Sequence, residues 1–234
     1  MKVLSLATRK EPDQTDFEEQ TASTRKGVFT SGIVSVQGDH RIALFFTGHN
    51  HAGENLAEVL KRRATELAPP IQMCDALSRN LPKELEVILA NCLSHGRRRF
   101  VEVTMNFPQE CLFVLEILKE VYQNDAEARR RDFSDQQRLE WHQAHSGAKM
   151  AKLKNWLTEQ IEQHQVEPNS SLGEAINYML NHWEALTLFL RQPGAPLDNN
   201  VCERALKKAI LHRKNAYFYG SHPKKLVENW GIQP

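Results

Sequence analysis

Residues 28–47 read VFTSGIVSVQGDHRIALFFT, and this stretch decides the class of fold. Two runs rich in β-branched and aromatic residues, Val28–Gln37 and Arg41–Thr47, flank a short polar turn. Gly38 in that turn can adopt the positive φ that a tight hairpin requires. The stretch therefore predicts two antiparallel strands, whose apolar faces are supplied by Ile33, Ile42, Phe45 and Phe46.

Strand-like and helical runs alternate on either side of this hairpin. We predict further strands at Lys2–Ala7, Ile71–Cys74 and Val87–Cys92. The spacing of apolar residues predicts helices over Ala52–Leu67, which ends before two prolines, and over His95–Val103. A strand-helix-strand order of this kind implies an α/β sheet.

The stretch from residue 108 to residue 191 has helical periodicity throughout. Ser171–Glu174 has the capping-box pattern and predicts the start of a helix that continues to Leu190. We interpret the polar run from Arg129 to His145 as solvated. The predicted division is a first part of the core at 1–107, a helical insertion at 108–191 and a C-terminal part of the core at 192–234.

The composition excludes several classes of protein. The chain has 234 residues, 30 Lys+Arg, 29 Asp+Glu and 41% hydrophobic residues, which excludes a polyanionic tail, a histone-like polycation and disorder over the whole length. The longest apolar run, Cys111–Leu115, is far shorter than the roughly 18 residues of a membrane span, so we expect no membrane partner. The four cysteines are widely spaced without a Cys-x-x-Cys pair, which favours a reducing cytoplasm over a disulfide framework or a zinc ribbon.

The last predicted helix carries an apolar stripe with charged neighbours. Glu203 lies beside Cys202 at the border of the stripe, where a carboxylate can face a half-buried cleft. Basic residues gather from this helix onward, at Arg204, Lys207, Lys208, Arg213, Lys214, Lys224 and Lys225, and Tyr217, Phe218 and Tyr219 lie among them. Positive charge with aromatic rings is typical of a nucleic-acid surface. The alternative is a solvated helix face followed by a buried strand.

Three other places offer candidate chemistry. Asp75 follows a predicted strand, where α/β sheets place functional groups, although a turn or capping role is the alternative. The clusters His49-Asn50-His51 and Cys92-x-x-His95 do not complete a four-ligand zinc set, which disfavours a metallohydrolase. Cys92 is interpreted as a core residue and His95 as a helix-start residue.

Three ordered blocks carry a resemblance to a known family. They are CLSHGRRRF at 92–100, LGEAINYMLNHWEALTLFL at 172–190 and LDNNVCERALK at 197–207, the last followed by Arg213-Lys214-Asn215 and Gly220-Ser221. Together they resemble the acidic-triad (DDE) transposases of insertion-sequence family sixty-six, over nearly the whole chain as the catalytic region of that family.

The resemblance implies a ribonuclease-H-like mixed sheet interrupted by a mostly helical insertion. It implies metal-dependent phosphodiester cleavage and strand transfer, with Asp75 as the second acid and Glu203 as the third, and with two Mg²⁺ or Mn²⁺ ions as cofactors. The implied partners are DNA at transposon ends and targets, further copies of the chain on DNA, and helper proteins of the same element, in a bacterial cytoplasm at the nucleoid. The residues expected to contact DNA are His95, Arg97, Arg98, Arg99, Arg204, Lys207, Lys208, Arg213 and Lys214.

The chain departs from the family pattern at several positions. The first acid of the family lies just before a segment that resembles Lys2-Val3-Leu4, so its equivalent is expected a few residues upstream of Met1, and neither Asp13 nor Asp16 fits that position. Ala76-Leu77 replaces Gly-Tyr after the second acid, and Lys207 replaces an arginine after the third. The expectation is a truncated, inactive copy. The alternative is a non-catalytic DNA-binding or assembly remnant.

Overall fold

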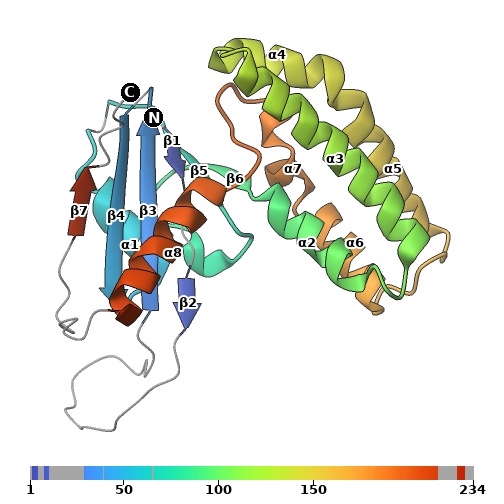
Figure 1. Ribbon diagram of the computed structural model, residues 1–234, viewed down its shortest axis with the longest axis horizontal. Coiled ribbons are helices and arrows are strands. Elements are labelled where there is room, and N and C mark those ends of the chain that lie inside the picture. The colour runs from blue at the N-terminus through green and yellow to red at the C-terminus, as the bar shows by residue number, and fades with distance from the viewer. Residues whose placement is uncertain are drawn as a thin grey trace, which may run out of the picture. The chain divides into compact units, whose positions relative to one another are not determined.

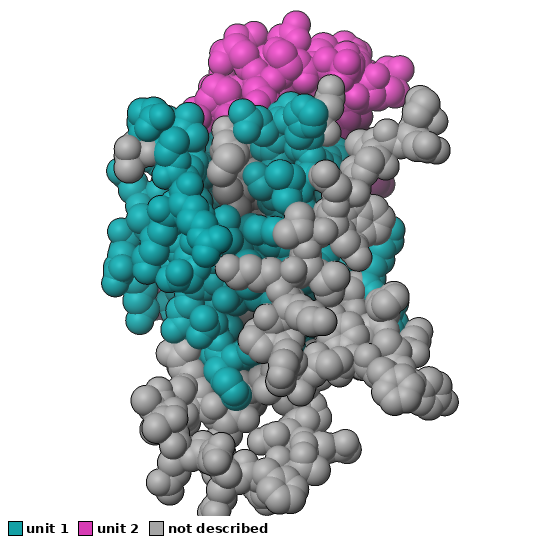
Figure 2. Space-filling view, turned by 90° about the vertical axis from the view of Figure 1, so that its left-hand side faces the viewer, with its two compact units in different colours: residues 1–88, 199–234 teal, residues 89–198 magenta. Residues whose placement is uncertain are grey.

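The computed structural model describes the backbone of residues 2–4, 8–10, 29–38, 40–64, 66–215 and 226–229. Side chains are described for 29–38, 40–64, 66–208 and 210–211. The chain forms two compact units, coloured separately in Figure 2. Residues 1–88 and 199–234 make the sheet unit, and residues 89–198 make the helical unit.

The strands form one mixed sheet in the order β6-β5-β1-β3-β4-β7, with β2 also paired to β3. Their bounds are β1 Lys2–Leu4, β2 Thr8–Lys10, β3 Phe29–Gln37, β4 His40–Gly48, β5 Ile71–Cys74, β6 Ile88–Asn91 and β7 Leu226–Asn229. The predicted hairpin is confirmed, because β3 and β4 pair antiparallel from Phe29↔Gly48 to Gln37↔His40 and Gly38 has a φ of +57°. β1 pairs antiparallel with β3 and parallel with β5, so the α/β class is also confirmed.

Two strands were not predicted from the sequence. β2 reads Thr-Arg-Lys and β7 reads Leu-Val-Glu-Asn, and neither has a run of apolar residues long enough to stand out. Each is a strand because its backbone pairs with a longer neighbour, β2 with β3 and β7 with β4. Tertiary pairing therefore outweighs weak local propensity at both places.

Helices α1 (Ala52–Leu60) and α8 (Asn200–Asn215) cover opposite faces of this sheet (Figure 1). Successive side chains of a strand point to opposite faces. Ile33 of β3 packs in a buried cluster with Leu56 of α1, whereas a Cβ built on the adjacent Gly32 would lie 3.5 Å from Leu206 Cδ1 of α8.

The first helix is shorter than predicted, since it ends at Leu60 and not at Leu67. The amides of Arg62 and Arg63 bond to carbonyls three residues back, which tightens the chain into a turn. Leu67 is 50% exposed, so a helix that continued to this residue would gain little stability from burying it.

The helical unit confirms the predicted helical character of the insertion. Its helices are α2 Leu93–Val103, α3 Pro108–Arg130, α4 Asp135–His145, α5 Gly147–Glu162, α6 Ser171–Asn181 and α7 Trp183–Leu186, and the 3₁₀ turn η2 follows at Leu188–Leu190. Leu118, Leu153 and Ile176 are fully buried in its core, and the Leu93 amide donates a 2.9 Å hydrogen bond to the Leu197 carbonyl, which joins the entry of the unit to its exit. Among the described residues, no helix has both the length and the apolar character needed to cross a bilayer.

The helix predicted over 171–190 differs from the observed one at both ends. Its N-cap is Ser170, whose hydroxyl accepts a 3.0 Å hydrogen bond from the Gly173 amide, so the capping residue is one position earlier than predicted. α6 ends at Asn181, because His182 takes a non-helical conformation with ψ of 13°, and the short α7 and η2 follow. Trp183 is buried, as expected for a core residue.

The interpretation of 129–145 as a solvated run is partly wrong. Arg129 to Arg131 are exposed, but His142 is buried and Arg138 is half-buried, and both contact the buried carboxylate of Asp125. Burial alone would raise the pKa of Asp125, yet the hydrogen bond from His142 and the charges of Arg138 and Arg129 lower it to about 2. Asp125 is therefore ionised at neutral pH, and its contacts with Arg138 and His142 link α3 to α4.

Asp125→Asn should therefore destabilise the helical unit. Because the pKa is lowered from 3.8 to about 2, the ionised carboxylate stabilises the fold above about pH 4, and this stabilisation is lost as the pH falls toward 2. Near neutral pH we expect a loss of about 2–3 kcal/mol in the free energy of unfolding, measured by urea denaturation, and a smaller difference from the wild type near pH 2.

The matched control is Glu127→Gln on the same helix, whose partners Arg130 and Arg131 are exposed. Exposed ion pairs contribute little, so this variant should unfold close to the wild type. Equal losses in the two variants would contradict the assignment of Asp125.

Candidate functional site

Asp75 lies directly after β5, at the carboxyl end of that strand. Its Oδ1 accepts a hydrogen bond from Nδ2 of Asn80, a fully buried residue at the end of the 3₁₀ turn η1 (Ser78–Asn80). The Asn80 carbonyl oxygen accepts a 2.7 Å hydrogen bond from Nε2 of Gln72, which is buried in β5. Asn80 thus orients the Asp75 carboxylate, and Gln72 in turn holds the backbone of Asn80.

The close approach of α1 to this segment depends on Gly53. A Cβ built on Gly53 would lie 2.2 Å from the Leu81 carbonyl oxygen and 2.9 Å from that of Arg79. Both atoms belong to backbone that cannot move without displacing Asn80, which lies between them in the chain. The missing side chain at Gly53 therefore allows the turn that holds Asp75 to pack where it does.

Glu203 lies in the first turn of α8. Its amide donates a 3.0 Å hydrogen bond to the carbonyl of Asn199, the buried residue that precedes the helix. The neighbouring Cys202 is fully buried, and Arg204 is exposed. The half-buried Glu203 thus has the border position that the apolar stripe predicts.

Both predicted acids belong to the sheet unit, and their supporting strands flank β1. Asp75 directly follows β5, and α8 packs on β3. β1 is the strand between β5 and β3. At about 4.8 Å between adjacent strands, β5 and β3 lie about 10 Å apart. Within the described residues of this unit, Asp75 and Glu203 do not belong to a common group of three or more Asp, Glu, His or Cys residues that could hold a metal.

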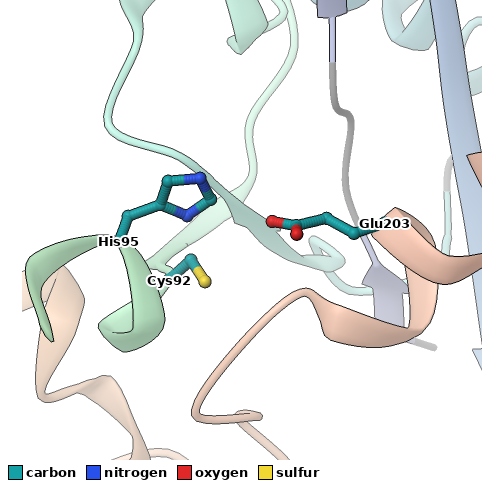
Figure 3. Close-up of side chains that lie close together, drawn as sticks. All are labelled: Cys92, His95 and Glu203. Atoms are coloured by element: carbon teal, nitrogen blue, oxygen red, sulfur yellow. The ribbon is translucent and has the colours of Figure 1, made fainter. Parts of the chain in front are cut away.

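Cys92 and His95 come from the start of α2 (Figure 3, which also shows Glu203 on α8). Cys92 is fully buried, as expected for a core residue, and its sulfur lies within 4.8 Å of a His95 ring nitrogen. Within the described helical unit no third ligand of the same kinds joins them.

The three consecutive arginines of α2 are exposed but not equivalent. The Arg99 guanidinium lies 4.2 Å from the centroid of the Tyr178 ring on α6, which favours a cation–π contact. Burial, together with the Arg99 charge, lowers the pKa of the adjacent His182. Arg97 instead lines a hollow with Lys119 and Tyr122, where the Tyr122 hydroxyl and the Ser94 hydroxyl are 2.8 Å apart.

The basic residues of the last helix are only partly described. Arg204, Lys207 and Lys208 are exposed on α8. Arg213 and Lys214 belong to the same helix, but the description covers only their backbone. The predictions on Asp13, Asp16, Tyr217, Phe218, Tyr219, Lys224 and Lys225 lie outside the described residues.

Three residues with a role at these sites were missed from the sequence. Asn80 and Gln72 orient Asp75, and Tyr178 holds Arg99. An asparagine five residues after a strand-end aspartate is a weak turn signal, and it could have drawn attention to Asn80. No pattern in the sequence indicates that Tyr178 and Arg99 meet, since they lie on different helices.

Gly53→Ala should disturb the support of Asp75. The added Cβ collides with backbone carbonyls, so we expect a loss of about 1–3 kcal/mol in stability and a lower melting temperature by circular dichroism. Gly48→Ala is the control, because a Cβ there meets no atom within 4 Å. A melting temperature for Gly53→Ala equal to that of Gly48→Ala would refute the proposed close approach.

Comparisons with known proteins identify relatives that match a little over half of the chain. Uncharacterized protein y4jD of Sinorhizobium fredii (strain NBRC 101917 / NGR234) is 37% identical over 134 residues, which cover 57% of this chain and 25% of that protein. Uncharacterized protein y4qI of the same strain is 33% identical over 134 residues, which cover 57% of this chain and 24% of that protein. The chain thus spans about a quarter of the length of these relatives. No solved structure matches it.

A family model supplies the wider match. The model described as "Transposase IS66 family" matches residues 8–224, which include β2, both predicted acids and the whole helical unit. This is the family that the three sequence blocks predicted. The chain belongs to the IS66 family of transposases.

Proposed function

We propose that this chain is the catalytic region of a DDE-type DNA transposase, in which Asp75 and Glu203 are metal ligands for phosphodiester cleavage and strand transfer. The observation that carries the proposal is the placement of these two acids. Asp75 is held at the end of β5 by Asn80, and Glu203 is held on α8 above β3, so the two supports flank β1. The family resemblance expects its first acid on the opening strand, and β1 is that strand here.

The arrangement of strands supports a ribonuclease-H-like core. β1 lies inside a mixed sheet, antiparallel to the β3–β4 hairpin and parallel to β5. The helical residues 89–198 are inserted before α8 returns the chain to the sheet unit. A helical insertion between the second and third acids is what the resemblance implies.

The two side chains fit a hard divalent cation. Asp75 and Glu203 offer carboxylate oxygens, the ligands that Mg²⁺ and Mn²⁺ prefer, and Asn80 fixes the orientation of one of them. A bound ion of this kind would activate a water or a 3′-hydroxyl and stabilise the leaving oxygen of the phosphodiester. Asn80 acts as a positioning residue, because its side-chain amide donates to the Asp75 Oδ1 and so fixes the orientation of the carboxylate.

DNA is the proposed partner of the exposed basic residues. Arg97 and Arg98 on α2 are exposed, as are Arg204 and Lys207 on α8, where Arg204 directly follows Glu203. Such side chains neutralise backbone phosphates without reading sequence. Arg99 contributes less to this surface, because its guanidinium already contacts Tyr178.

The test is transposition by the element's own transposase, assayed in the longest reading frame that contains this chain. Asp75→Asn and Glu203→Gln should each lower metal-dependent cleavage and strand transfer by about 100-fold or more, because each substitution removes a ligand charge. Asn80→Ala should cost about 10–100-fold, the usual effect of a residue that orients a metal ligand.

Glu86→Gln supplies the matched control, since Glu86 is an exposed acid of the same unit. It should leave cleavage at the wild-type level. Full activity in Glu203→Gln would refute the site assignment. Salt-dependent DNA binding without any metal-dependent cleavage would instead favour the non-catalytic DNA-binding role.

A further inference from the structure

A hollow of about 280 Å³ lies in the sheet unit, between α8 and the β3–β4 hairpin. Its floor is apolar and made of small side chains. Val34 and Ala43 are direct cross-strand partners in the β3–β4 ladder, and Ala205 of α8 faces them across the hollow. Val34 and Ala43 are buried, so the floor is fixed by core packing.

Three cationic side chains surround this floor. Arg41 lies two residues before Ala43 on β4, which places it on the same face of the sheet. Arg204 and Lys208 are four residues apart on α8, so they project from the same side of the helix. No acidic residue lines the hollow in the described part of the chain.

The two arginines have no competing partner among the residues that the structure describes. Within the described residues, the structure gives neither Arg41 nor Arg204 a hydrogen bond or ion pair through its side chain. By contrast, Arg129, Arg130, Arg131 and Arg138 all bind carboxylates in the helical unit. Arg41 and Arg204 therefore keep their guanidinium donors available for a ligand.

We propose that this hollow is a phosphate-binding pocket, in which Arg41, Arg204 and Lys208 hold a phosphate group and the apolar floor contacts the attached sugar. Guanidinium groups bind phosphate oxygens in a bidentate manner, and the lysine adds a further positive charge. Small apolar side chains beneath the cations suit a deoxyribose better than they suit a free acidic side chain.

The favoured source of the phosphate is a DNA backbone, and this part of the inference rests on the proposed function. Arg204 immediately follows Glu203, so the pocket lies on the same helix as the proposed metal ligand. DNA whose reacting phosphate lies near Glu203 can place a neighbouring phosphate in the pocket. Arg41 is the new element, because it comes from a strand of the hairpin and lies far in sequence from the basic C-terminal end.

The experiment compares Arg41→Gln with Arg62→Gln in the intact chain. Arg62 is an exposed arginine just after α1, which covers the opposite face of the sheet, and no side-chain hydrogen bond or ion pair is found for it among the described residues. Binding of a short fluorescent DNA duplex is measured by anisotropy between about 50 and 200 mM salt. Binding of inorganic pyrophosphate is measured separately by calorimetry, and circular dichroism melting checks the fold.

Arg41→Gln should weaken duplex binding several-fold and lower the slope of log Kd against log salt by about 0.9, the value of one phosphate contact. Arg62→Gln should match the wild type, and both variants should melt with it, because neither arginine has a hydrogen-bond or ion-pair partner in the described part of the chain to lose. If Arg41→Gln weakens binding of the duplex but not of pyrophosphate, the pocket is assigned to DNA. If only pyrophosphate binds in a manner that depends on Arg41, the DNA assignment of the pocket is wrong and the pocket takes a small phosphate, while the cleavage assays decide the proposed function separately.

Two results would overturn the pocket. The first is an Arg41→Gln variant that binds both probes as the wild type does, whatever the outcome of the cleavage assays. The second is a wild-type chain that binds neither probe. Full cleavage activity in Glu203→Gln together with Arg41-dependent DNA binding would refute the proposed metal ligand and leave the pocket standing, since the pocket does not need that ligand.

Discussion

The sheet unit depends on the contact between α8 and β3 at Gly32. The Cys202 thiol donates to the Gly32 carbonyl at 3.4 Å, across 170 residues of sequence, and Leu206 packs on the same position. This contact joins α8 to the β3–β4 hairpin, two elements that lie far apart in the sequence. Because Glu203 lies between Cys202 and Arg204, the packing of α8 on β3 fixes Glu203 and one wall of the basic hollow together.

The helical unit has a core of its own, which explains how so long an insertion is tolerated. Its entry and exit are joined by the hydrogen bond between Leu93 and Leu197, so the chain leaves and returns at one place. Inside the unit, the buried Asp125 carboxylate contacts Arg138 and His142, and the His142 Nδ1 and the Ser146 hydroxyl share a 3.1 Å hydrogen bond. A satisfied polar network of this kind orders α3, α4 and the start of α5 relative to one another.

The near-neutral net charge of +1 conceals an uneven use of charge. On α3 to α5 many charged side chains are paired, as in Glu127 with Arg130 and Lys149 with Glu120. On α2, by contrast, Arg97 and Arg98 make no ion pair with described residues, and the same holds for Arg41 and Arg204 of the sheet unit. Paired charges stabilise the fold weakly, whereas unpaired cations remain available to phosphates.

The sequence alone determined the α/β class, the β3–β4 hairpin, the helical character of the insertion and the family, because alternation, turn residues and ordered motifs are local features. It also pointed to Asp75 at a strand end and to Glu203 at the border of a helix stripe. Only the tertiary structure decided that Asn80 orients Asp75, that Asp125 is buried, and that Arg41 lies beside α8. The reason is physical: side-chain partners on separate elements are chosen by packing, and packing leaves no periodic signal in the chain. The same holds for β2 and β7, which are strands because longer neighbours supply their hydrogen bonds.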